Sequence, residues 1–364
     1  MKVLAIETSC DDTSLAIVSL GEWWFFCEEM VAFHQIELHE SYGGVVPELA
    51  SREHLNQIIP VLYDLCYRVT KGYDLDVMMD DVDKVVVTQT PWLPGSLIIG
   101  RTTALLLSMW YKKPCQFVNH LHGHIVSRFL DRQDIDKERS LIASVSWWHS
   151  DLSILSKKYK NNDQMTVDVD KYLVEKKAST RDDAIGEVFD KISRLLWWPY
   201  PWGVRISQRA QENDKEKTQE KYPFVIEKFK RILLADTYDF SFSGMKSQAH
   251  NFIISYKKKL WLAEHEQLPS EIISYLSFEF QEAAADILST RILQIVKDGN
   301  IKNVALVWWV SANTRIREKI QMMLDKYNHD TGQNVSFFTP SQFDYCTDNA
   351  AMIGVAGMLD IETI

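Results

Sequence analysis

Short apolar runs alternate with longer segments of helical periodicity along this chain, which is the pattern of an α/β protein. The apolar runs are short enough for buried strands, and polar turns separate them. The expected strands cover residues 2–8, 13–19, 24–33, 84–88, 116–118, 140–146, 152–155, 303–307 and 334–337. The expected helices cover residues 48–68, 97–110, 181–196, 204–213, 245–256, 269–298, 311–327 and 349–359, with one more starting at His120.

The segments between these elements are polar. Residues 161–177 are charged and predict an edge hairpin, residues 199–203 predict a turn, and residues 215–222 predict a charged connection. Asp182 or Asp183 is expected near the start of the 181–196 helix, where a carboxylate suits the unpaired N–H groups.

The strand pattern occurs twice. A meander at residues 2–33 is repeated around residues 140–155, and strand–helix units follow each copy. The repetition predicts two related α/β lobes facing a central cleft, residues 1–135 and residues 136–364, with packing of the last helix against the N-terminal lobe left open. Ligands of such folds sit at strand carboxyl ends and helix N-termini.

Length and composition agree with a two-lobe protein of the cytoplasm. The 364 residues are enough for two cores, and no apolar run approaches the ~18 residues of a membrane span. Glu7 comes too early for a secretory signal. The five cysteines are scattered without CxxC spacing, which favours a reducing compartment over a disulfide frame or a thiolate zinc site.

The formal net charge of −10 argues against indiscriminate nucleic-acid binding, which depends on neutralising phosphates. Basic clusters do occur, and each is most simply a solvated face. They lie at residues 157–160, 215–221, 228–231 and 257–259. A nucleic-acid substrate would need these clusters or a partner protein to supply the positive field.

Two histidines suggest a metal site. His120 and His124 are four residues apart, so a helix would project both imidazoles from one face, and Asp348 ahead of the last helix could add a carboxylate. Two imidazoles and one carboxylate leave coordination positions open for substrate, which suits Fe(II), Zn or Mn. The alternative from the spacing alone is a pair of hydrogen-bonded or exposed helix histidines.

Six segments in this order carry a family resemblance: residues 6–13 (IETSCDDT), 42–54 (YGGVVPELASREH), 119–124 (NHLHGH), 186–191 (GEVFDK), 240–246 (FSFSGMK) and 346–354 (CTDNAAMIG). Together they resemble the bacterial-type tRNA N6-adenosine threonylcarbamoyltransferases, a glycoprotease-like family, over nearly the whole chain. The resemblance implies the two-lobe actin/hexokinase-like (ASKHA) fold.

The resemblance also implies an activity, which is transfer of threonylcarbamoyl from threonylcarbamoyl-adenylate to tRNA. The acceptor would be N6 of the adenosine 3′ of the anticodon in tRNAs that read ANN codons. His120, His124 and Asp348 would hold one Fe(2+) or Zn(2+). The implied partners are tRNA, a related metal-free dimerisation subunit and a small ATPase subunit.

Residue roles follow from the implied chemistry. An adenine amine is a poor nucleophile, so positioning and proton removal matter, and Asp11 or Glu7 in the first turn is the candidate general base. The alternative for this pair is turn chemistry and a buried strand carboxylate. By resemblance, substrate would be bound by Val145, Ser146, Trp147, Trp148, His149, Asp190, Gly203 and Asn313. Asp190 would hold the ribose hydroxyls; the alternative is a plain surface acid.

The chain departs from the family pattern where that pattern has glycine. Tryptophan stands instead at positions 92, 147, 148, 197, 202, 308 and 309. Such glycines let backbone approach phosphate and adopt positive φ, so an indole strains the turn and fills the nucleotide's volume. A plugged paralogue, an altered chain and an enzyme with rearranged turns all remain as explanations.

Three functions are therefore compared. The retained metal residues favour the transferase, and the tryptophans favour a non-catalytic, metal-binding scaffold subunit of the tRNA-modification complex. A sugar kinase or ATPase of the same fold class ranks lower, because that class does not use an HxxxH metal pair.

Overall fold

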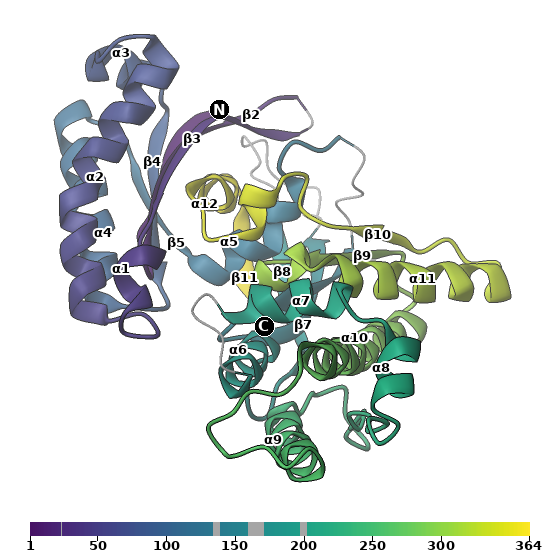
Figure 1. Ribbon diagram of the computed structural model, residues 1–364. Coiled ribbons are helices and arrows are strands. Elements are labelled where there is room, and N and C mark those ends of the chain that lie inside the picture. Colours follow the sequence, from purple (N-terminus) through teal and green to yellow (C-terminus); the bar gives the residue numbers. More distant parts are fainter. Residues whose placement is uncertain (23, 134–138, 159–170, 197–201) are drawn as a thin grey trace. The chain divides into compact units, whose positions relative to one another are not determined.

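The computed structural model describes residues 1–22, 24–133, 139–158, 171–196 and 202–364 (Figure 1). The chain forms two compact units. Unit 1 contains Met1–Arg139, Leu155–Glu175 and Phe338–Ile364, and unit 2 contains Ser140–Ile154 and Lys176–Phe337.

Unit 1 is built on a five-stranded sheet of order β3-β2-β1-β4-β5. Its strands are β1 (Lys2–Glu7), β2 (Asp12–Leu20), β3 (Phe25–His34), β4 (Lys84–Thr90) and β5 (Cys115–Asn119). Strand β1 runs antiparallel to β2 and parallel to β4, with Ile6 opposite both Leu15 and Val87. The polar turn after β1 and the carboxyl ends of β4 and β5 therefore reach the same edge of the sheet.

Alternating residues of this sheet face two different layers of helices. Leu4, Ile6 and Val87 share a core with buried residues of α2 (Pro47–Thr70) and α4 (Pro94–Tyr111). On the other face lies α12 (Ala350–Met358), which packs on β1 and β2 through glycines. A Cβ at Gly354 would come within 2.6 Å of a Val18 methyl, so only glycine allows this approach.

The remaining elements of unit 1 are short. They are helices α1 (Ile36–Glu40), α3 (Leu75–Asp80) and α5 (His120–Val126), the 3-10 turns η1 (Ser127–Phe129) and η3 (Phe343–Cys346), and strand β11 (Asp360–Thr363). Sequence periodicity did not predict α1, α3 or β11, each of which is too short to show a repeating apolar pattern.

The second sheet has the order β10-β9-β6-β7-β8-β11. Its other strands are β6 (Arg139–Val145), β7 (Ser150–Lys158), β8 (Lys171–Ser179), β9 (Asn303–Val307) and β10 (Ser336–Phe338). The order β8-β7-β6-β9-β10 repeats the order β3-β2-β1-β4-β5, and β6 is parallel to β9 as β1 is to β4. The predicted duplication is confirmed.

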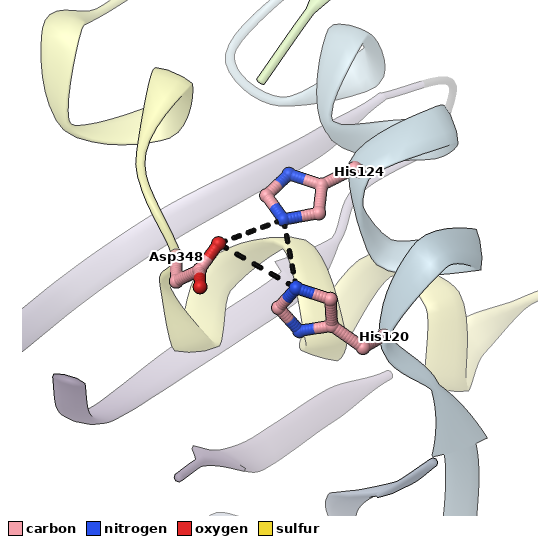
Figure 2. A group of neighbouring side chains, drawn as sticks. All are labelled: His120, His124 and Asp348. Atoms are coloured by element: carbon pink, nitrogen blue, oxygen red, sulfur yellow. Dashed lines mark hydrogen bonds and ion pairs between the residues drawn. The ribbon is translucent and has the colours of Figure 1, made fainter. Parts of the chain in front are cut away.

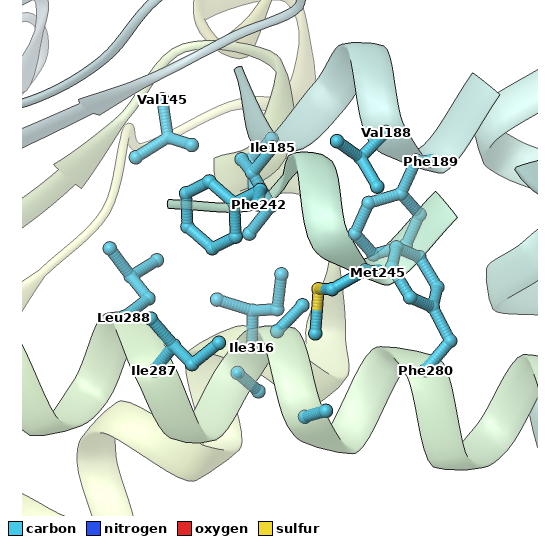
Figure 3. Packing of buried hydrophobic residues seen from close by; sticks show 14 of the residues in the cluster. Val145, Ile185, Val188, Phe189, Phe242, Met245, Phe280, Ile287, Leu288 and Ile316 are labelled. Carbon is cyan, nitrogen blue, oxygen red and sulfur yellow. The ribbon is translucent and has the colours of Figure 1, made fainter. Parts of the chain in front are cut away.

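The helices of unit 2 are α6 (Ile185–Leu195), α7 (Trp202–Gln211), α8 (Lys215–Lys221), α9 (Ser243–Lys259), α10 (Ser270–Gly299) and α11 (Thr314–Thr331), with the 3-10 turn η2 (Trp309–Ala312). Side chains from β6, α6, α9, α10 and α11 point toward one another in one apolar core (Figure 3). Phe189 packs edge-on against Phe280 of α10, with ring centroids 4.7 Å apart. This core holds α6 in place, and Asp190 lies in the middle of that helix.

Four sequence predictions need correction. Residues 215–221 form helix α8, with Asp214 as its cap, rather than a charged connection. Neither Asp182 nor Asp183 caps α6, which begins without a side-chain cap. The carboxylate of Asp182 instead accepts the backbone N–H groups of Phe242 and Ser243 at the start of α9.

The other two corrections concern the expected edge hairpin and the expected turn at Gly203. Residues 171–177 belong to β8, which is interior because β11 pairs with it, so they are not at a sheet edge. Residues 161–170 of the expected hairpin lie outside the described residues. Gly203 lies in helix α7 rather than in a turn, and residues 199–201 of that expected turn are also outside the described part. Among the described residues, no helix is both long and apolar enough to cross a membrane.

Candidate metal centre and substrate residues

The two histidines lie on α5, directly after β5. Asn119 starts the helix, since its side chain accepts the backbone N–H of Leu121 at 2.8 Å. His120 and His124 are fully buried, and their Nε2 atoms are 3.1 Å apart. The four-residue spacing therefore places both imidazoles on one face, as predicted.

Asp348 reaches the same point from the other end of the chain (Figure 2). It lies between η3 and α12, and the adjacent Asn349 caps α12 by accepting the N–H of Met352 at 2.9 Å. Asp348 Oδ1 is 2.9 Å from His124 Nε2 and 3.5 Å from His120 Nε2. One atom from each of the three residues lies within 4.8 Å of the other two, and all three residues belong to unit 1.

These separations fit a metal ion. Ligand atoms about 2.0–2.2 Å from a tetrahedral metal lie roughly 3.3–3.6 Å from one another. The three observed distances, from 2.9 to 3.5 Å, require only a small expansion of the group. Two imidazole nitrogens and one carboxylate oxygen are donors that Fe(II) and Zn both accept.

The ionisation states agree with a cation site. Burial opposes ionisation of Asp348, but the charge of His120 and hydrogen bonds from both imidazoles hold its pKa far below the ordinary value. Burial lowers the pKa of His124 to about 4, which leaves a neutral imidazole. Burial also opposes protonation of His120, but the charges of Glu7 and Asp348 raise its pKa to about 10. A metal would therefore replace the proton of His120.

Glu7 lies directly behind His120. The carboxylate is fully buried, and its Oε2 atom lies 3.0 Å from His120 Nδ1. The same oxygen accepts the Thr88 hydroxyl, and Oε1 accepts the backbone N–H of Ser9. Ser9 Oγ lies 3.2 Å from the same imidazole nitrogen. This arrangement orients the imidazole from its outer side.

Asp11 is the other candidate base. Its side chain is partly exposed in the turn after β1, and burial, reinforced by the negative charge of Asp348, raises its pKa. The structure therefore places Asp11 close enough to the metal group for the two carboxylates to interact. Ser9 and Thr88 were not predicted as site residues, and the signal available for them was their position at the ends of predicted strands.

The predicted substrate turn at residues 146–149 is tightly bonded within unit 2. Ser146 Oγ accepts the N–H groups of Trp148 at 3.2 Å and His149 at 3.1 Å. The backbone oxygen of Ser146 accepts the N–H of Gly186 at 3.2 Å, which joins the turn to α6. Val145, one residue earlier, is buried in the core of unit 2, so only its backbone could face a ligand.

The structure brings two further candidates, Asp190 and Gly203, together near Trp147. A Cβ built on Gly186 would lie 2.6 Å from Trp147 Cδ1, and one on Gly203 would lie 3.3 Å from Asp190 Oδ1 and 4.0 Å from Trp147 Nε1. Burial raises the pKa of Asp190 to about 8. Its Oδ1 atom is buried and has no hydrogen-bond partner among the described residues. This carboxyl group is therefore not a plain surface acid.

Asn313 is hydrogen-bonded within unit 2. Its Oδ1 accepts the N–H of Ile316, which makes it the cap of α11. Its Nδ2 donates to Ser207 Oγ and to Gln281 Oε1, each at 2.9 Å. Both amide hydrogens are thus used within unit 2, so a nucleotide contact would have to replace one of these bonds.

Comparison with known proteins gives a consistent identification. The family model described as tRNA N6-adenosine threonylcarbamoyltransferase matches residues 28–355. A relative of that name from Caldicellulosiruptor saccharolyticus is 37% identical over 359 residues, covering 98% of this chain and 92% of the relative. Another, from Clostridioides difficile, is 34% identical over 354 residues, covering 97% and 91%.

A solved structure supports the fold. HypF of T. kodakarensis aligns with 98% of this chain and 47% of its own, with a TM-score of 0.52 and 13% sequence identity. With the repeated strand order, this likeness confirms the predicted fold class. The chain belongs to the tRNA N6-adenosine threonylcarbamoyltransferase family.

Proposed function

We propose that this chain transfers the threonylcarbamoyl group of threonylcarbamoyl-adenylate to N6 of the adenosine 3′ of the anticodon in tRNAs that read ANN codons. The observation that carries the proposal is the buried group of His120, His124 and Asp348, assembled from segments 224 residues apart in a member of this family. In the reaction, the N6–carbonyl bond forms and the carbonyl–oxygen bond to AMP breaks.

We further propose that the three residues hold one Fe(2+) or Zn(2+). The two imidazole nitrogens and the carboxylate oxygen are suitable donors, and the distances of 2.9 to 3.5 Å between them support this assignment. Such an ion, when bound, supplies Lewis-acid stabilisation for charge that develops on the acyl oxygen.

Glu7 would act as a positioning residue in this site. By accepting the Nδ1–H of His120, it fixes the tautomer in which Nε2 faces His124 and Asp348. The hydroxyl of Thr88 and the N–H of Ser9 hold the carboxylate in place. Because both oxygens of Glu7 are engaged, it is the weaker of the two candidate bases.

Asp11 is the better candidate to take the proton that N6 loses. Its partial exposure gives it access to solvent and substrate, and its raised pKa increases its affinity for a proton. On the nucleotide side, Asp190 is proposed to bind ribose hydroxyls, supported by its buried and unsatisfied Oδ1. Residues 145–149, Gly203 and Asn313 complete the proposed substrate set.

The proposed setting is a cytoplasmic complex. The substrate is tRNA, and a related metal-free dimerisation subunit and a small ATPase subunit are proposed as partners on the family resemblance. The net charge of −10 supports partners that supply positive potential. We also propose domain limits at residues 1–135 and 136–364, with α12 returning to the first domain; its packing on β1 and β2 supports this division.

The family match and the names of the relatives favour the enzyme over a non-catalytic scaffold. The test supplies threonylcarbamoyl-adenylate and tRNA to the purified chain with its partner subunits, and quantifies the modified nucleoside by mass spectrometry. His124→Ala should abolish product. His122→Ala is the matched control on the same helix, since His122 bonds Thr363 outside the metal group, and it should retain activity. Equal activity of His124→Ala and the original chain would refute the proposal.

A further inference from the structure

Among the described residues, three tryptophans have positive φ: Trp92, Trp261 and Trp308. Trp92 has φ 103°, and Trp308 has φ 73° with ψ −173°. The second combination lies in a region that is essentially confined to glycine, because a Cβ there clashes with the neighbouring peptide. A bulky residue at positive φ is an outlier wherever it occurs.

Three tryptophans also lie directly against candidate site residues. Within unit 1, the ring of Trp92 meets His120 edge-on, with centroids 6.1 Å apart and an interplanar angle of 89°. Within unit 2, the ring of Trp308 meets His149 in the same way, at 6.0 Å and 83°. Trp147 covers Gly186 and approaches Gly203 beside Asp190. Each indole therefore packs directly on a histidine or a glycine of the candidate site.

The composition of the whole chain is low in glycine and high in tryptophan. Glycine accounts for 14 of 364 residues, where usual usage of ~7% would give about 25. Tryptophan accounts for 12, and eight of these form the adjacent pairs 23–24, 147–148, 197–198 and 308–309. Tryptophan in place of glycine at many positions explains both the low number of glycines and the high number of tryptophans.

We propose that positions 92, 147 and 308 are glycine positions, that the chain carries glycine there in its own organism, and that this form binds the adenylate donor more tightly than the form with tryptophan. This inference rests on the proposed function for the identity of the ligand. The backbone requirement at positions 92 and 308 is independent of it.

The backbone requirement is tested by comparing glycine with alanine. Trp308→Gly and Trp308→Ala remove the same indole, so the lost packing cancels, and only the Cβ differs. Glycine should give the higher Tm at position 308, and likewise at position 92. The control is Trp110, 80% exposed within helix α4, where alanine should give the higher Tm because glycine is a poor helix former. A higher Tm for Trp308→Ala than for Trp308→Gly would overturn the inference.

Ligand binding is tested with AMP. The variant that combines Trp92→Gly, Trp147→Gly and Trp308→Gly should bind AMP at least tenfold more tightly than the original chain in isothermal titration. Trp261→Gly is the matched control, since Trp261 also has positive φ but its side chain is 94% exposed, and it should leave the AMP affinity unchanged. No gain in affinity for the triple variant would overturn the inference. Tight AMP binding without tRNA modification would instead refute the proposed function and leave this inference standing.

The protein purified from its own organism gives the final test. Peptide mass spectrometry should find glycine at positions 92, 147 and 308. Tryptophan at these positions in the natural protein would overturn the inference.

Discussion

Replacing Glu7 by glutamine tests how the metal centre is supported. Three donors converge on this carboxylate: the Nδ1–H of His120, the hydroxyl of Thr88 and the backbone N–H of Ser9. A carboxylate has two accepting oxygens, whereas an amide has one oxygen and two N–H donors of its own. Glutamine keeps the shape, but at least one of the three donors must lose its acceptor, and the negative charge behind His120 is removed.

The expected loss of metal affinity follows from the position of Glu7, which orients a metal ligand without touching the metal. Loss of such a partner weakens metal affinity by roughly 10–100-fold, which corresponds to about 1.4–2.7 kcal/mol. We expect Glu7→Gln to lose metal affinity within this range, because both oxygens of Glu7 accept hydrogen bonds and the negative charge no longer fixes the histidine tautomer. Glu37→Gln, on the exposed face of α1, is the control and should leave metal affinity unchanged.

The assay is a competition titration of Zn²⁺ against a chromophoric chelator, with circular dichroism to verify that the variant is folded. A folded Glu7→Gln protein whose zinc affinity stays within about twofold of the original, a change of only ~0.4 kcal/mol, would refute the assigned outer-shell role. Unchanged affinity would also return Glu7 to the position of a catalytic candidate.

Two further predictions concern stability. Since burial raises the pKa of Asp190 from 3.8 to about 8, folding favours its protonated form, so its contribution is full below about pH 4 and is lost as the pH rises toward 8. Asparagine at position 190 cannot ionise, so the free energy of unfolding of Asp190→Asn should fall less over this range than that of the original chain, by up to roughly 1.4 kcal/mol per pH unit. Urea denaturation at pH 5 and pH 8 measures this change for both proteins, and an equal change in the two would contradict the prediction. Gly354→Ala should lower the free energy of unfolding by about 1–3 kcal/mol, because the new methyl group would meet Val18. An unchanged denaturation midpoint would show that α12 can move away from the sheet.

Much of the fold was predictable from the sequence because the strands of its cores are continuous apolar segments. The strands around Ile6, Leu15 and Val87 are short and continuously apolar, and their repetition near residue 140 predicted the second sheet. Helix α8 was missed because its residues are almost all polar or charged, so it has no apolar stripe. Its available signal was Asp214, a capping residue three positions ahead of the Lys217 N–H that it accepts.

The metal group was predictable in part. The spacing of His120 and His124 indicated a shared helix face, but Asp348 was only a possible third ligand until the family resemblance supported it, because no local pattern links residues 224 positions apart. The role of Glu7 depends on the strand order, in which β4 lies between β1 and β5, so that Glu7, Thr88 and His120 come together at one edge of the sheet. Likewise, Asp182 caps α9 rather than α6 through tertiary packing that sequence spacing does not encode.

The most direct test of the account measures bound metal and tRNA modification in the same preparations of the original chain and of Asp348→Asn. The account predicts roughly one Fe or Zn ion per original chain, and loss of both metal and modified nucleoside in the variant, because the carboxylate completes the three-ligand group. A variant that loses its metal but modifies tRNA at the original rate would contradict it, as would an active original chain that contains no metal.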